Sequence, residues 1–137
     1  MKIKLSFVTN SSTSCFVVLG IQTDIWNLTE KYGNEIFKHY KKYCLTNGYI
    51  PKTKEQFFKN DNYDLYEFIH EWVGTVGLKA GIILSSEIIM IGKSPFEMSE
   101  NQTFQGFKSQ VFKSFKKLGF DIDIGDLKKI KESWEDR

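Results

Sequence analysis

Six consecutive short polar residues near the start of the chain have the most unusual chemistry in the sequence. They are Thr9, Asn10, Ser11, Ser12, Thr13 and Ser14. Their hydroxyls and backbone amides suit the binding of an anion, and the hydroxyls also suit a modifying group. The segment lacks the glycines and the lysine of a phosphate-binding loop, so it carries no nucleotide-binding fingerprint. On chemistry alone we favour a simpler interpretation, a turn in which these side chains bond to the local backbone.

Two groups of residues have spacings that partly match metal-binding patterns. Glu67, His70 and Glu71 fall within about one turn of a predicted helix, where two of them can share a face. A single Glu-x-x-His pattern is weak, and a solvated helix face explains it more simply. The second group consists of Asp121, Asp123 and Asp126. Its spacing does not fit a calcium loop, and the glutamate at the twelfth position is missing. The sequence therefore predicts no metal and no cofactor.

Lysine supplies nearly all of the basic charge, because Arg137 is the only arginine. Arginine provides the planar fork that grips phosphate and guanine edges, so its scarcity weighs against a specific reader of nucleic acid. The net charge of +2 is also too balanced to predict nucleic-acid binding. A weaker alternative is a basic patch that attracts phosphates, formed by Lys108, Lys113, Lys116 and Lys117, with Lys128, Lys129 and Lys131 further along. The aspartates between these two groups favour an ordinary solvated face instead.

The composition indicates a single soluble globular domain over residues 1–137, with 41% hydrophobic and 26% charged residues. Aromatic residues make up 15%, which predicts a core filled by large rings. No run approaches the roughly 18 apolar residues of a membrane span. Only Cys15 and Cys44 are present and no signal peptide is convincing, so we expect the reducing cytoplasm.

Apolar patterning predicts the strands. Residues 2–8 alternate between apolar and polar side chains, which is the period of a half-buried strand. Residues 15–21 and 87–92 are apolar on both faces, so both strands should lie inside the sheet. Residues 78–84 should pair with 87–92 as a hairpin around Ser85 and Ser86. A last short strand is expected at residues 120–124.

Helical periodicity predicts helices near residues 25–46, 54–59, 63–73 and 103–118. Asn47 and Gly48 should end the first helix, Thr53 should cap the second through a capping box, and Asp64 should cap the third. Residues 126–136 fit either a helix or a strand. The expected fold is α+β, a mainly antiparallel sheet of about four or five strands with helices packed on it.

Residues 7–16 read Phe-Val-Thr-Asn-Ser-Ser-Thr-Ser-Cys-Phe. This segment resembles the Phe-Val-Ser-Asn, serine run and Phe that open many small, uncharacterised bacteriophage-encoded proteins. The C-terminal third resembles such proteins more loosely, from Ile91-Gly92-Lys93-Ser94-Pro95 onward. The chain departs from the serine run at Thr9, Thr13 and Cys15. The resemblance implies a phage or prophage origin, and therefore the cytoplasm of a host cell, but it implies no activity.

Two classes of function stay open, and no catalytic residue is identified. The first is a non-enzymatic accessory protein that binds an unidentified host or phage protein. It is favoured because the sequence contains neither a Gly-x-Ser-x-Gly elbow nor a Cys-x-x-Cys pair. The alternative is a small enzyme, or a nucleotide or anion binder, that uses residues 9–14 together with acids such as Asp64 or Glu67. The oligomeric state is not indicated.

Overall fold

The computed structural model describes residues 3–5, 15–59, 63–83 and 87–133, and these residues form an antiparallel sheet covered by helices. The strands are β1 (Ile3–Leu5), β2 (Cys15–Asp24), β3 (Lys79–Ile83), β4 (Ile88–Lys93) and β5 (Lys128–Ser133). The helices are α1 (Ile25–Asn47), α2 (Lys54–Phe57), α3 (Tyr63–Gly74) and α4 (Phe104–Lys117), with short 3-10 helices η1 (Pro95–Glu97) and η2 (Ile124–Asp126). The expected α+β class is confirmed.

The strand order is β1-β3-β4-β2-β5, and every neighbouring pair is antiparallel. β2 and β4 are both interior, as their continuous apolar runs predicted, and they pair in the register Ile21 opposite Ile91. β3 and β4 pair as the expected hairpin, with Ile83 opposite Ile88. β1, at one edge, and β2 are separated in the sheet by β3 and β4, so these two sequence neighbours do not pair.

The strand expected at residues 120–124 is wrong. Phe120 is buried and Ile122 is half-buried, but residues 120–123 have no strand partner and lead directly into η2. The amide of Asp123 donates to the Asp126 carboxylate at 2.8 Å, which helps to close this 3-10 turn. The alternation therefore marks an irregular segment with one side against the core. The last strand, β5, lies within the residues for which helix and strand were both open.

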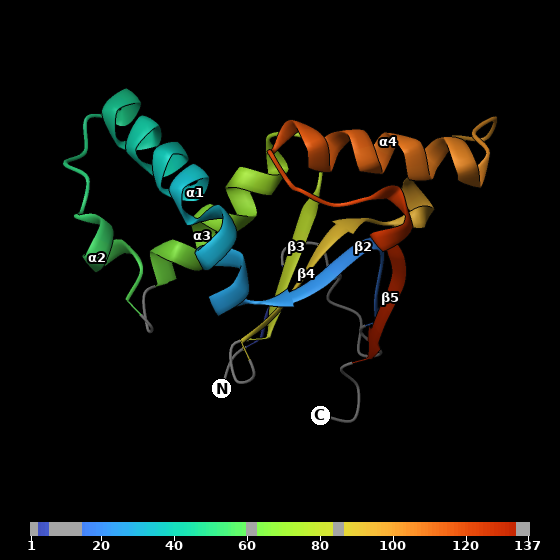
Figure 1. The fold of residues 1–137 in the computed structure, drawn as a ribbon, viewed down its shortest axis with the longest axis horizontal. Helices are drawn as coiled ribbons and strands as arrows, with labels where there is room; N and C mark the ends of the chain where they lie inside the picture. The colour runs from blue at the N-terminus through green and yellow to red at the C-terminus, as the bar shows by residue number, and fades with distance from the viewer. Residues whose placement is uncertain (1–2, 6–14, 60–62, 84–86, 134–137) are drawn as a thin grey trace.

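One face of the sheet and the inner faces of the helices share a continuous hydrophobic core. The sheet contributes Leu19, Ile89 and Ile91, and α4 contributes Phe107, Val111 and Phe115, all buried. The helix expected near residues 103–118 is thus confirmed, and its periodic apolar side chains face the core, except that Phe104 at its start is exposed. Figure 1 shows α4 lying over the sheet, with α1, α2 and α3 grouped beside it.

Local signals set the ends of the helices. The Asp24 carboxylate caps α1 by accepting from the amide of Asn27 at 2.8 Å, and Gly48 ends the helix in the left-handed conformation, with φ of 76°. Thr53 and Gln56 form the predicted capping box of α2. α3 begins at Tyr63, so Asp64 lies inside its first turn and is not the cap.

The C-terminal half of α1 and all of α2 lie away from the strands (Figure 1). Their contact with α3 is built from aromatic rings. The Tyr40 and Phe57 rings are stacked with centroids 4.3 Å apart, and Phe68 meets Tyr40 edge-on at 5.1 Å. No helix in the described part of the chain is both long enough and apolar enough to cross a lipid bilayer.

Candidate functional site

The six polar residues 9–14 lie outside the described residues, so their proposed role in binding an anion stays a prediction. The strands that precede and follow this segment, β1 and β2, are both members of the sheet. The segment therefore joins two strands, as the sequence indicated, although those strands are not neighbours.

The four lysines of the predicted patch all lie on α4, a helix without a single acidic residue. Lys113, Lys116 and Lys117 are exposed, whereas Lys108 is half-buried. Lys129 of β5 comes close to the start of this helix, with its ammonium 5.0 Å from the centre of the Phe104 ring. The structure thus brings part of the patch together, and nucleic-acid binding stays the weaker prediction.

The two acidic groups whose spacing partly matched metal-binding patterns lie in different elements, one on α3 and the other around η2. Within the described ranges, no three His, Cys, Asp or Glu side chains are placed to hold a metal ion. Glu67 and Glu71 line a groove on α3, whereas His70 does not belong to its lining. Asp126 instead accepts the hydrogen bond that closes η2.

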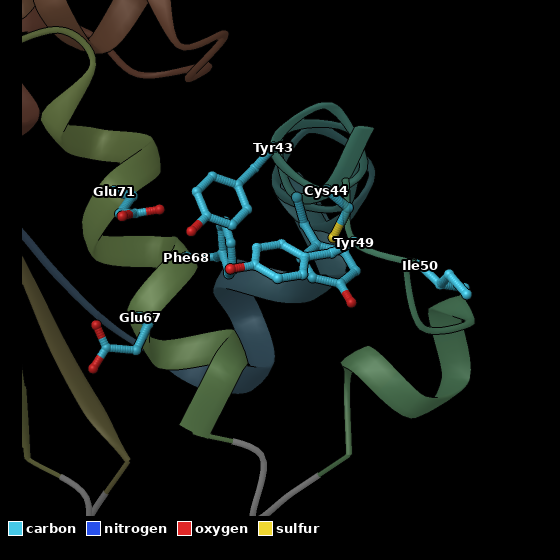
Figure 2. Close-up of a pocket in the computed structure, with 8 residues that line it drawn as sticks. Tyr43, Cys44, Tyr49, Ile50, Glu67, Phe68 and Glu71 are labelled. Atoms are coloured by element: carbon cyan, nitrogen blue, oxygen red, sulfur yellow. The ribbon is translucent and has the colours of Figure 1, made fainter. Parts of the chain in front are cut away.

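The groove lies between the C-terminal end of α1, the segment that leads to α2, and α3 (Figure 2), and it has a volume of about 490 Å³. Three tyrosines, an isoleucine and a phenylalanine give it an aromatic and apolar character, and two glutamates add charge. Its lining consists of Tyr40, Tyr43, Cys44, Tyr49, Ile50, Glu67, Phe68 and Glu71.

Buried side chains hold the floor of the groove in place. Tyr40 and Cys44 are one turn apart on α1 and both are buried. The Tyr40 hydroxyl accepts a hydrogen bond from the amide of Lys52 at 2.8 Å, which ties the segment after α1 to the helix. Burial raises the pKa of Tyr40 above its usual value, and the bond from Lys52 opposes this shift. The floor is therefore fixed by packing and by a backbone contact.

The outer wall follows from the way α1 ends. The left-handed conformation of Gly48 reverses the chain, and the amide of Tyr49 then donates to the carbonyl of Cys44 at 2.8 Å. This brings the Tyr49 ring beside Tyr43, with centroids 6.2 Å apart and planes 23° apart. Tyr43 also meets the Phe68 ring edge-on at 5.0 Å, which links this wall to α3. The helix stop thus creates the aromatic wall.

The opposite wall is α3, which presents two carboxylates one turn apart. In Figure 2 the Tyr43 hydroxyl points toward α3, on which Glu71 lies, whereas the Glu67 side chain points away from the tyrosines. These two glutamates are the only charged groups among the described lining residues. The groove therefore combines aromatic rings with negative charge.

His39 lies near this wall, on α1. Burial lowers its pKa below the usual value of 6.5, the Glu71 carboxylate opposes that shift, and the Lys42 ammonium adds to it. The His39 ring also meets Phe68 edge-on, with centroids 6.2 Å apart. Packing of His39 against α3 therefore makes its imidazole harder to protonate.

Sequence reasoning missed Tyr43, Tyr49 and Ile50. Tyr43 falls outside the apolar stripe of its helix, and Tyr49 and Ile50 follow the helix stop directly. The sequence did contain a signal for these residues. It places large apolar side chains on a solvated helix face and just beyond the Asn-Gly pair that ends the helix. Their meeting with α3 depends on tertiary packing, which the local pattern does not contain.

A second hollow in the described structure has a different character. One lies between β2, the start of α1 and residues 120–122, with a volume of about 350 Å³. It is lined by Lys31 and Asp121, which carry opposite charges, and there the Asp121 amide donates to the Tyr32 hydroxyl at 3.1 Å. The groove beside α3 differs because its charge has one sign and its aromatic rings are exposed.

Comparison of the chain with protein-family models, with curated proteins and with solved structures finds no match.

Proposed function

We propose that this chain is a protein-binding module and that the groove between α1 and α3 receives its partner. The observation that carries the proposal is the exposure of large side chains at one place. Tyr43 is 38% exposed, Tyr49 60% and Ile50 93%, and all three line the same groove. Exposed apolar side chains scattered singly need no explanation, but a group that rims a hollow is typical of an interaction site.

The chemistry of the rim suits contact with another protein. Tyrosine is enriched at protein interfaces because its ring provides a large contact area and its hydroxyl provides a hydrogen bond. Tyr43 of the stacked pair contacts buried Phe68, which in turn meets buried Tyr40, so part of the order needed for binding exists before the partner arrives. The resemblance to phage-encoded proteins agrees with a host or phage protein as the partner.

The test is comparative capture from a bacterial lysate with the full chain immobilised. The double variant Tyr49→Ala, Ile50→Ala should lose the proteins that the unchanged chain retains at physiological salt, because it removes the two most exposed large apolar side chains of the groove. Matched controls are Leu45→Ala and Phe96→Ala. Both remove an exposed apolar side chain, 76% and 89% exposed respectively, that does not line the groove.

The controls decide the outcome of the capture. Quantitative mass spectrometry should find the same proteins with both controls as with the unchanged chain. If the double variant retains the same proteins, or if the controls lose them equally, the groove is not the binding site.

A further inference from the structure

We propose that the outer surface of α4, together with the start of β5, binds single-stranded nucleic acid without regard to its base sequence. The surface is separate from the groove beside α3, because the described lining of that groove includes no residue of α4 or β5. The inference goes beyond the proposed function and follows from a row of alternating aromatic and basic side chains along one side of α4.

The row runs along α4 with one member at every fourth residue. It consists of Phe104, Lys108, Phe112 and Lys116. Residues four apart are neighbours on a helix surface and are about 6 Å apart along its axis, so rings alternate with ammonium groups. Phe104 is 40% exposed and Lys116 is exposed, whereas the two middle members are half-buried. Both ends of the row are therefore open to solvent.

Lysine contacts extend the row to β5. Lys129 pairs with Leu19 of β2, so both side chains lie on the face of the sheet that α4 covers (Figure 1). The Lys129 ammonium lies 5.0 Å from the centre of the Phe104 ring. In the same way, the Lys116 ammonium lies 5.8 Å from the centre of the Phe112 ring. Each aromatic ring of the row thus has a cation beside it.

Neighbouring carboxylates do not neutralise this surface. α4 also carries Lys113 and Lys117, both exposed, and it contains no acidic residue. Within the described ranges, neither Lys129 nor any lysine of α4 forms an ion pair with a carboxylate. Asp126 lines a hollow together with Lys129, but its carboxylate accepts a hydrogen bond from the Asp123 amide. The surface therefore presents unpaired ammonium groups, which attract phosphates.

The alternation of rings and cations favours a single strand over other polyanions. A single strand offers phosphates to the lysines and unpaired bases to the rings, and any base can stack because each has a π-face. A duplex keeps its bases stacked on each other and offers such a row only phosphates. A lipid surface requires the apolar side of α4, whose Phe107, Val111 and Phe115 are buried in the core. Lysine contacts phosphate as a point charge, so no sequence preference is expected.

The probe is a fluorescein-labelled strand of about twelve thymidines, within the length that one such surface covers, and fluorescence anisotropy follows its binding to the full chain. The double variant Lys116→Gln, Lys129→Gln should bind about tenfold more weakly. It should also lower the salt slope by about 1.4, since each neutralised phosphate contributes about 0.7 on a single strand. Phe104→Leu keeps an apolar side chain but removes the ring, so it should weaken binding about tenfold without changing the slope.

Two controls lie outside the surface and should bind the strand as the unchanged chain does. Lys38→Gln removes an exposed lysine of α1, and Tyr49→Ala alters the groove beside α3. If the strand does not bind at low salt, or if the controls weaken binding as much as the row variants do, the site is wrong. Because Tyr49→Ala is a control here, that failure leaves the proposed function of the groove standing.

Competitors decide the class of ligand. An unlabelled single strand should displace the probe better than a duplex of the same length, polyglutamate, or vesicles of phosphatidylcholine and phosphatidylserine. Equal displacement by any of these, or an unchanged affinity of Phe104→Leu, would show an unselective cationic surface and overturn the proposal. Circular dichroism separates lost binding from lost folding, and the exposed pair Lys113→Gln, Lys117→Gln serves if a row variant does not fold.

Discussion

At the scale of single residues, His39 links the packing of α1 against α3 to pH. Burial, the largest influence, lowers its pKa in the folded chain below 6.5. The unfolded chain therefore binds a proton at a higher pH than the folded chain does. The contribution of His39 to stability is fully present above the unfolded pKa and is lost as the pH falls toward the folded value.

We therefore predict that the unchanged chain loses more stability than His39→Gln between about pH 7.5 and about pH 5.5. The measurement is the urea midpoint of each protein at the two pH values. The difference should be modest, because His39 is only half-buried and solvent screens its charge. Identical pH dependence in the two proteins would show that His39 does not titrate in this way.

At the scale of elements, β2 and β4 approach each other closely where two glycines face across the strands. Gly20 and Gly92 are directly paired. A Cβ on Gly20 would lie 1.8 Å from the carbonyl oxygen of Ile91, and a Cβ on Gly92 would lie 2.3 Å from the carbonyl oxygen of Leu19. Both obstacles are backbone atoms in the interior of the sheet, so they cannot move without distorting the strand pairing.

Gly20→Ala and Gly92→Ala should each lower the free energy of unfolding by about 1–3 kcal/mol, as forced overpacking typically does. Gly74→Ala is the matched control, because no atom lies within 4 Å of the Cβ it would add. This control should be neutral or should stabilise α3 by a few tenths of a kcal/mol up to about 1 kcal/mol. Urea unfolding measures all three, and unchanged stability of the two sheet variants would contradict the close approach.

Elements with a strong local signal were predicted well from the sequence. The apolar period of α4, the Gly48 stop and the Thr53 capping box all depend on contacts within a few residues, and all three are confirmed. The strand expected at residues 120–124 failed because alternation reports only that one side is buried. In the structure Phe120 and Ile122 face the core without any hydrogen-bonded neighbouring strand.

The groove could not be predicted in the same way, because it depends on two helices meeting. The sequence singled out Glu67 and Glu71 only as members of a weak metal pattern, with a solvated helix face as the favoured interpretation, and it did not connect them with Tyr43 or Tyr49. Ring contacts between the two helices, such as those of Tyr40 and Tyr43 with Phe68, bring α1 and α3 together. The polar segment at residues 9–14, the most unusual feature of the sequence, lies outside the described residues.

At the scale of the whole molecule, one core supports both the sheet and the groove. Tyr40, Cys44 and Phe57 beneath the groove belong to the same buried cluster as Leu19 and Ile91 of the sheet. The floor of the groove is therefore held by the fold, while Tyr49 and Ile50 on its rim are largely exposed. Rim variants should change binding without unfolding the chain, whereas sheet variants should weaken both.

Hydrogen–deuterium exchange of the full chain, with and without a protein captured from the lysate, tests the binding site most directly. We predict that the bound protein slows exchange in residues 43–52 and 65–71, which form the walls of the groove, and leaves α4 and β5 unchanged. Slower exchange confined to α4 and β5, or no change in the groove walls at saturating partner, would contradict the assignment of the groove as the binding site.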